Sequence, residues 1–283
     1  MASRSETRGA GTYARRTVVI VYLFLLVIWP LTLVVRHTFD NGWGNMSDAL
    51  GDANVVFALQ MTLYVAGWAV AINTIFGVGI SLLLVRQEFP GRSLLSALVD
   101  LPLSVSPVVV GLALLLAYGG ENGAFGPALE RIGLQVAFTP LGMILATAFI
   151  SLPLVIREIV PVLQEVGTDQ ELAARSLGAG SWQTFRRITL PSIKWALVYG
   201  VVLSLARSLG EFGAVKIISG NLIGETQTAT LVVEQKYQDF EQGAAYATSF
   251  LLALIAIAAL VVVAVLRPSH SSFESRRTDA EDE

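Results

Sequence analysis

The chain has 283 residues, of which 54% are hydrophobic and only 14% are charged, and its formal net charge is −3. This composition is too apolar for an ordinary soluble domain, so we expect membrane lipid to surround the protein. The absence of cysteine excludes disulfides, thiolate metal sites and thiol catalysis. No phosphate-loop motif (GxxxxGK followed by Ser or Thr) occurs, and no His-rich or carboxylate-rich spacing indicates a metal cage. We therefore expect no cofactor, metal or nucleic acid bound to this chain.

Six stretches are long and apolar enough to cross a membrane as helices, which takes about 20 residues each. In chain order they are Thr17–Val35, Phe57–Val85, Leu94–Tyr118, Pro140–Val160, Trp195–Ile218 and Ala244–Leu266. The first follows two arginines, as the core of a signal peptide does, but it runs for 19 residues and lacks a small-residue cleavage pattern. We expect it to be retained, which predicts an all-α membrane protein with six transmembrane helices.

Lys and Arg concentrate on one side of this predicted layout. Fourteen of them lie in the two termini, between the second and third spans, or around the connection between the fourth and fifth. The opposite side has only Arg36, Arg131 and Lys236. Because basic residues accumulate on the cytoplasmic side, we expect a multi-pass protein of the cell (inner) membrane with both termini in the cytoplasm.

The connections on the outer side are polar. We expect brief interfacial helices in the two at 36–56 and 119–139, which are rich in Gly, Asn and Asp. The third, at 219–243, includes Thr226, Thr228 and Thr230. These threonines either face an extracytoplasmic partner or belong to an ordinary surface loop.

The connection between the fourth and fifth spans is the most informative segment. We expect a short helix capped by Asp169, a turn at Gly178 and Gly180, and a second helix capped by Ser181. The second helix has an apolar stripe, and a proline then marks the start of the fifth span. The stripe and the proline are formed by Trp182, Phe185, Ile188 and Pro191. Such an apolar knob needs a partner to cover it.

This segment resembles the EAA loop of ABC importer permeases, whose pattern is E-A-A, three residues, G, nine residues, then I-x-L-P. The positions that match are Ala173, Ala174, Gly178, Ile188, Leu190 and Pro191. Leu172 stands where the family has its glutamate, and Glu171 lies one residue earlier. The resemblance implies a type I ABC importer permease fold, and a loop that docks into a groove of an ATPase subunit. Whether Glu171 supplies a polar contact there, or none is made, stays open.

The resemblance extends beyond the loop, because residues 58–63 are similar to the opening of the family's core domain. It implies a permease core at 57–266, with the coupling loop at about 167–191. Before it we expect a cytoplasmic tail at 1–16 and the first span with its outer connection at 17–56. After it we expect a polar cytoplasmic tail at 267–283.

Two further segments resemble the W-type subunit of the sulfate/thiosulfate branch: residues 100–111, and residues 205–220 continued by 224–228. Molybdate permeases share the proline-rich and Gly-Glu-Phe-Gly elements, whereas the Ser-Gly and Gly-Glu-Thr continuation favours sulfate. The resemblance implies two ATP-binding subunits, a second permease subunit of the T type, and an extracytoplasmic sulfate-binding protein. ATP would be bound by the partner subunits. A permease for molybdate or another oxyanion is the alternative.

The third span contains candidates for the translocation path. Pro102 and Pro107 each remove a backbone donor, so the span is expected to break or kink there. Ser104 and Ser106 offer neutral hydroxyls that suit a passing dianion. A packing kink without substrate contact is the alternative.

Arg207 and Glu211 are ionisable residues inside the predicted fifth span, where unpaired charge is costly. At a spacing of four residues they share a helix face and can neutralise each other. We favour a structural or gating pair near the path over a direct substrate ligand.

Two other classes of function are less well supported. An ion-coupled secondary transporter would leave the coupling loop unexplained, and Glu211 is the one acidic residue well inside a predicted span. A membrane-embedded enzyme would need an intramembrane histidine, a GxSxG elbow or metal-ligand spacing, none of which occurs. We therefore expect a non-catalytic permease subunit.

Overall fold

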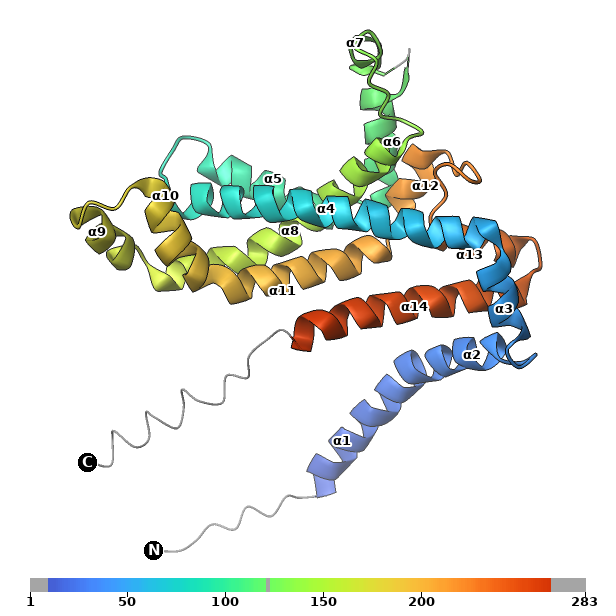
Figure 1. Cartoon of the computed structure of the whole chain (residues 1–283). Coiled ribbons are helices and arrows are strands. Elements are labelled where there is room, and N and C mark those ends of the chain that lie inside the picture. Colours follow the sequence, from blue (N-terminus) through green and yellow to red (C-terminus); the bar gives the residue numbers. More distant parts are fainter. Residues whose placement is uncertain (1–9, 121–122, 266–283) are drawn as a thin grey trace, which may run out of the picture.

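The computed structural model describes residues 10–120 and 123–265, and the predicted C-terminal tail at 267–283 lies outside them. Helices make up the regular structure of this described part, as predicted. Among the described residues, five helices are long and apolar enough to span a membrane, and there are six spans if one bent pair counts as a single span. Apart from the first, these helices run along one common direction (Figure 1). They are α4 (Ala53–Arg86), α8 (Pro140–Val166), α11 (Leu190–Leu209) and α14 (Gln242–Val265).

The first predicted span is a helix without a break, formed by α1 (Ala10–Leu23), the π-helical turn η1 (Phe24–Ile28) and α2 (Trp29–Thr38). The π turn lies just before Pro30, whose missing N–H interrupts the regular bond pattern. In Figure 1, α2 lies beside α14, whereas α1 leads away from the bundle. None of its most apolar window is buried within the chain, so lipid or another subunit must cover it.

The centre of the bundle is formed by α4, α8 and α11. They pack closely because a glycine of α4 and a glycine of α11 both face the same valine of α8. A Cβ added to Gly77 of α4 would lie 2.7 Å from Val155 Cγ1, and one added to Gly200 of α11 would lie 2.9 Å from Val155 Cα. Val155 of α8 is fully buried between them. Small residues of this kind let transmembrane helices approach. Gly77 and Gly200 therefore serve close helix packing.

A polar contact crosses the same three helices. Asn73 Nδ2 of α4 donates to Ser151 Oγ of α8 at 2.8 Å and to Ser204 Oγ of α11 at 3.2 Å. All three side chains are buried. Interhelical hydrogen bonds of this kind hold membrane helices in one register.

The third predicted span is broken directly before Pro107, as predicted, whereas Pro102 lies inside a helix that does not end there. It consists of α5 (Arg92–Ser104) and α6 (Pro107–Tyr118), which are bent by 115°. Val105 and Ser106 between them have extended backbones, the conformation that a following proline favours. In Figure 1, α6 runs across the direction of the long helices and carries α7 (Gly126–Glu130) at its far end.

The prediction of one continuous fifth span at Trp195–Ile218 is wrong. The helix ends at Leu209, and a separate α12 runs over Gly213–Ser219. At its other end, toward the coupling loop, α11 is directly preceded by the π-helical turn η3 (Phe185–Thr189). A hydropathy average over apolar residues does not detect this break, which Gly210 and Gly213 flank.

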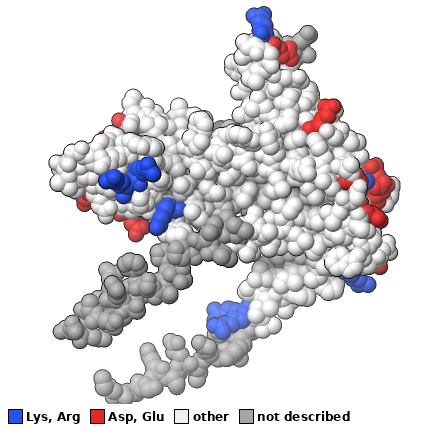
Figure 2. Space-filling view, viewed as in Figure 1, with Lys and Arg blue, Asp and Glu red and all other residues white. Residues whose placement is uncertain are grey.

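The outer connections contain short helices, as expected for the first two, which include α3 (Gly44–Gly51) and α7. The third was read as a polar loop, but it also contains α13 (Ala229–Gln238). The charged side chains visible in Figure 2 gather at the two ends of the bundle and at the tip beyond α6, and the surface between carries almost none. This distribution fits a membrane around the middle of the bundle.

Candidate functional site

The coupling loop, residues 167–191, forms the helix, turn and helix predicted from its sequence. The helices are α9 (Asp169–Ser176) and α10 (Ser181–Thr184), the second continuing into η3. The predicted caps Asp169 and Ser181 are instead the first helical residues. The cap positions belong to Thr168 and Gly180, neither of which makes a side-chain cap bond.

The turn between these helices depends on Gly178. Its φ of +87° is left-handed, a conformation that glycine adopts without a steric penalty. The N–H of Gly178 donates to Arg175 O at 2.9 Å, and that of Ala179 to Ala174 O at 3.0 Å, which satisfies carbonyls at the helix end. A Cβ at Gly178 would meet nothing within 4 Å. The requirement for glycine is therefore one of backbone conformation and not of space.

Large apolar side chains of the loop are exposed. Leu177 is 89% exposed, Trp182 is 72% exposed and Leu172 is 54% exposed. Trp182 stacks on Phe185, with ring centroids 5.5 Å apart. Of the predicted stripe only Trp182 is exposed, because Phe185 and Ile188 are half-buried. Leu177 was missed, although a leucine directly before a turn glycine in a polar loop is a usable signal.

A cleft of about 270 Å³ opens between α9 and α10. Its walls are formed by Ala174, Leu177, Gly178, Ala179, Gln183, Thr184, Arg187 and Ile188. Of the remaining matched positions, Ala173 and Pro191 are exposed and Leu190 is half-buried. The loop thus presents an apolar, indented surface to a partner.

Glu171 turns inward from this surface. It is buried, and its Oε1 accepts hydrogen bonds from Thr189 Oγ1 at 2.9 Å and from Arg86 Nε and Nη2 at 3.3 and 3.2 Å. The sequence left open whether Glu171 faces the partner, and in the structure it is engaged inside the chain. Leu172 occupies the outward position. The role of Arg86 was not foreseen, because its partner lies 85 residues away.

The broken third and fifth spans meet each other. A Cβ on Gly111 of α6 would lie 2.7 Å from Ala214 O of α12, and one on Gly213 would lie 3.1 Å from Pro107 Cβ. Pro102 is buried within α5 and Pro107 is half-buried, whereas Ser104 and Ser106 are exposed. The structure therefore brings Pro107 next to the break that contains Glu211.

Arg207 and Glu211 form the predicted ion pair, with Arg207 Nη1 2.8 Å from Glu211 Oε2. They do not share a helix, because Arg207 is in the last turn of α11 and Glu211 lies beyond its end. Glu211 Oε1 accepts from the N–H of Ala214 at 3.1 Å, at the start of α12. The Oε2 atom makes no hydrogen bond within the described residues, so its contact with Arg207 is a charge attraction without hydrogen-bond geometry. The Arg207 side chain is 38% exposed and that of Glu211 is 2% exposed.

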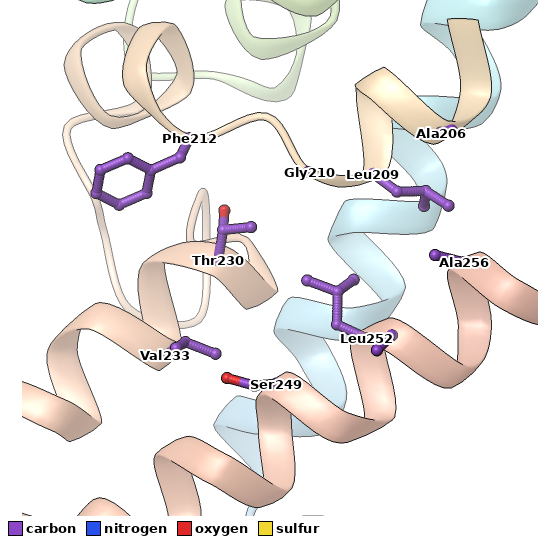
Figure 3. Close-up of a pocket in the computed structure, with 10 residues that line it drawn as sticks. Ala206, Leu209, Gly210, Phe212, Thr230, Val233, Ser249, Leu252 and Ala256 are labelled. Carbon is purple, nitrogen blue, oxygen red and sulfur yellow. The ribbon is translucent and has the colours of Figure 1, made fainter. Parts of the chain in front are cut away.

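A cavity of about 450 Å³ lies beside this break, between α11, α13 and α14 (Figure 3). Most of its lining is apolar, and its hydroxyls belong to Thr230 and Ser249. Thr230 donates to Glu211 O at 2.9 Å and Ser249 to Ala245 O at 2.9 Å. Both hydroxyl protons are therefore committed to backbone carbonyls, and neither side chain offers a free donor to a dianion.

Two threonines of the third predicted outer connection, Thr226 and Thr228, point inward, so neither of the two alternatives left open, a partner-facing loop or an ordinary surface loop, describes them. Both are buried, as is Gln227 between them. Thr226 Oγ1 donates to Ser219 O at 2.6 Å, and Gln227 Oε1 accepts from Asn54 Nδ2 at 2.9 Å. This segment ties the start of α13 to α12 and to the start of α4.

A charged cluster joins the outer end of α4 to α13. Lys236 Nζ lies 3.0 Å from Asp52 Oδ2 and 2.7 Å from Glu241 Oε2. The bonds to Glu241 and Asp52 raise the pKa of Lys236. Burial by itself raises the pKa of Asp52, but hydrogen bonds from Lys236 and Asn54 outweigh it and lower that pKa. Within the described residues, no group of three or more His, Asp or Glu is placed to hold a metal ion.

Comparison with known proteins places this architecture in a family. The family model described as binding-protein-dependent transport system inner membrane component matches residues 73–271. The chain belongs to this family. It is 45% identical over 266 residues to the sulfate transport system permease protein CysW of Synechococcus elongatus, covering 94% of this chain and 93% of that one. It is 37% identical over 257 residues to the sulfate transport system permease protein CysT of Escherichia coli, covering 91% of each.

The solved structures agree on the fold. A chain of a bacterial alginate ABC transporter, crystallised with an alginate-bound periplasmic protein, superposes with a TM-score of 0.75. The match covers 89% of this chain and 92% of that one at 17% identity. The chain is thus a multi-pass membrane protein with the type I ABC importer permease fold predicted from its sequence.

Proposed function

We propose that this chain is the W-type permease subunit of an ATP-driven sulfate importer. Its likeness to sulfate permease proteins along most of their length supports the substrate class. The observation that carries the coupling role is the exposed apolar surface of the coupling loop. In a chain without a phosphate loop, this surface needs a partner, and an ATPase subunit is the partner that the family membership supports.

The proposed complex has two permease subunits of unequal type, two ATP-binding subunits and an extracytoplasmic sulfate-binding protein. ATP binds to the ATPase subunits, and this chain carries no cofactor. Both termini and the coupling loop lie in the cytoplasm, which is supported by the bias of Lys and Arg.

We assign the translocation path to the place where the broken spans meet. Pro107 and Gly213 bring the starts of α6 and α12 together, and both helix breaks lie next to this contact. Interrupted helices within a membrane are stable where they adjoin protein or a watery cavity. Ser104 and Ser106 provide exposed hydroxyls on this element, and the buried Glu211 is neutralised by Arg207, which avoids an isolated negative charge near a dianion.

Uptake of radiolabelled sulfate tests the proposal. Cells that lack their own sulfate permeases should regain uptake when they express this chain with its partner subunits. A matched strain should express the same set with Leu177→Asp and Trp182→Asp, which place charge on the docking surface while changing exposed side chains. Uptake in that strain should fall to background while the variant chain is still inserted.

The substrate class is tested in the same cells. Unlabelled thiosulfate and molybdate are added as competitors, and a tetrahedral oxyanion that shares the path should reduce uptake of labelled sulfate. Full uptake without any ATPase subunit would reject the proposal and favour an ion-coupled transporter. Uptake of molybdate without uptake of sulfate would reject the substrate assignment alone.

A further inference from the structure

At the end of the bundle that carries the coupling loop, one guanidinium joins several segments that are distant in sequence. Arg86 is the last residue of α4, and its side chain is only 15% exposed. Its Nη1 donates to Leu163 O at 3.0 Å, and its Nη2 donates to Gly167 O at 2.7 Å. Its Nε and Nη2 also donate to Glu171 Oε1. A planar guanidinium can hold three acceptors at once, which an ammonium cannot do in the same geometry.

The two carbonyls belong to the junction between α8 and α9. The carbonyl of Leu163 is in the last turn of α8, where helical partners are missing and a cation is favoured by the helix dipole. Gly167 ends α8 with φ +66° and ψ −160°, a conformation that other residues rarely adopt. A Cβ there would meet nothing within 4 Å, so the glycine serves the backbone conformation. Gly167 therefore connects α8 to α9 through a backbone conformation that favours glycine, and Arg86 donates a hydrogen bond to its carbonyl.

Glu171 extends this junction to the start of α11. Its Oε1 receives the Thr189 hydroxyl as well as Arg86, and Thr189 is the last residue of η3. The helix packing of α9 is mainly against α10 and η3, which belong to the coupling loop itself. The buried contact between Arg86 and Glu171 links α9 directly to α4.

We propose that Arg86 is a positioning residue that carries displacement of the coupling helix α9 into the span α4. This inference rests on the proposed function, because it assumes that an ATPase moves the loop. Without Arg86, rotation at Gly167 would absorb a displacement of α9. With Arg86 in place, its guanidinium binds both Gly167 and the coupling helix α9. These two segments therefore move together with the end of α4.

The test is the ratio of sulfate imported to ATP hydrolysed, measured with the full complex and its binding protein in proteoliposomes. Arg86→Gln should lower this ratio about ten-fold or more, because the neutral glutamine amide cannot replace all the charge-assisted hydrogen bonds that the guanidinium donates. ATP hydrolysis should continue, because the docking surface of the loop is unchanged. Arg86→Lys should recover only part of the ratio, since a point charge replaces the guanidinium but not its geometry.

Arg157→Gln is the matched control. It removes an arginine whose Nε lies 2.9 Å from Asp100 Oδ1, in an ion pair between α8 and α5 with both side chains about half exposed. Its ratio should stay at the wild-type value. A ratio for Arg86→Gln equal to that of Arg157→Gln, at equal complex yield, would overturn the proposal even if the wild-type complex imports sulfate. Failure of the wild-type complex to import sulfate would instead count against the proposed function.

Thr189→Val covers the case in which Arg86→Gln does not assemble. This substitution keeps the shape of the side chain and removes one bond to Glu171. The ratio should fall about ten-fold, roughly the effect of one hydrogen bond to a charged group. An unchanged ratio in an assembled Thr189→Val complex would also overturn the proposal.

Discussion

The coupling loop and the third outer connection are both polar segments between apolar helices, yet they are built in opposite ways. In the coupling loop, Leu177 and Trp182 point outward and the charged Glu171 points inward. In the outer connection, Thr226 and Gln227 are buried and bonded within the chain. The composition of a loop therefore does not determine which of its side chains are exposed at the surface. One loop is a surface for a partner, and the other closes the end of its own helix bundle.

The largest effect is expected from a test of whether the coupling loop and the outer connections lie on opposite sides of the membrane. The chain has no cysteine, so single thiols introduced at Gly180 of the coupling loop and at Ile132 of the second outer connection report their own accessibility. Gly180 has open space around a Cβ, and Ile132 is 74% exposed, so both substitutions should be tolerated. We expect a membrane-impermeant maleimide to label Ile132→Cys in intact cells and Gly180→Cys only after permeabilisation. Labelling of both from one side would contradict the six-span topology.

The next largest effect is expected at the ion pair between Arg207 and the buried Glu211. Arg207→Ala leaves the Glu211 carboxylate buried without its partner, which costs about 3–5 kcal/mol. Glu211→Ala leaves Arg207, whose side chain is 38% exposed and can reach water, so this variant should lose less. The double variant should recover part of the complex yield lost in Arg207→Ala. The wild type, the two single variants and the double variant form a double-mutant cycle. Complex yield and sulfate uptake are measured for all four.

This cycle also separates a pair from a ligand. If Arg207 bound sulfate directly, Arg207→Ala would abolish uptake at normal complex yield, and Glu211→Ala would be neutral or favourable. Additive losses in the cycle would reject the pairing.

A smaller effect is expected in the turn of the coupling loop. Gly178→Ala should cost roughly 1–2 kcal/mol, because an L-residue is placed in the left-handed region. Association with the ATPase subunit should weaken by a similar amount, which a pull-down at several ATPase concentrations would measure.

Gly180→Ser is the control for this prediction. Gly180 has an extended backbone at the N-cap of α10, where serine is favoured, so this variant should bind the ATPase as well as wild type. Equal binding of Gly178→Ala and Gly180→Ser would show that the strained turn does not matter for docking.

The sequence by itself predicted the features that depend on local pattern. Apolar length predicted the first, second, fourth and sixth spans, the proline at 107 predicted the break in the third, and the spacing around Gly178 predicted the turn of the coupling loop. Each of these follows from a few neighbouring residues, because helix length, a missing N–H and a left-handed turn are properties of the local backbone.

Only the tertiary structure decided which side chains meet across the bundle. The end of α11 at Leu209, the inward position of Glu171 and the burial of Thr226 depend on partners 85 residues away or in other helices. A buried polar group needs a partner, and the fold determines which donor or acceptor lies within reach. The sequence therefore determined that this protein is a helical membrane permease with a coupling loop. The packing of α4, α8 and α11 decided that the Arg86 guanidinium lies within hydrogen-bond distance of Leu163, Gly167 and Glu171.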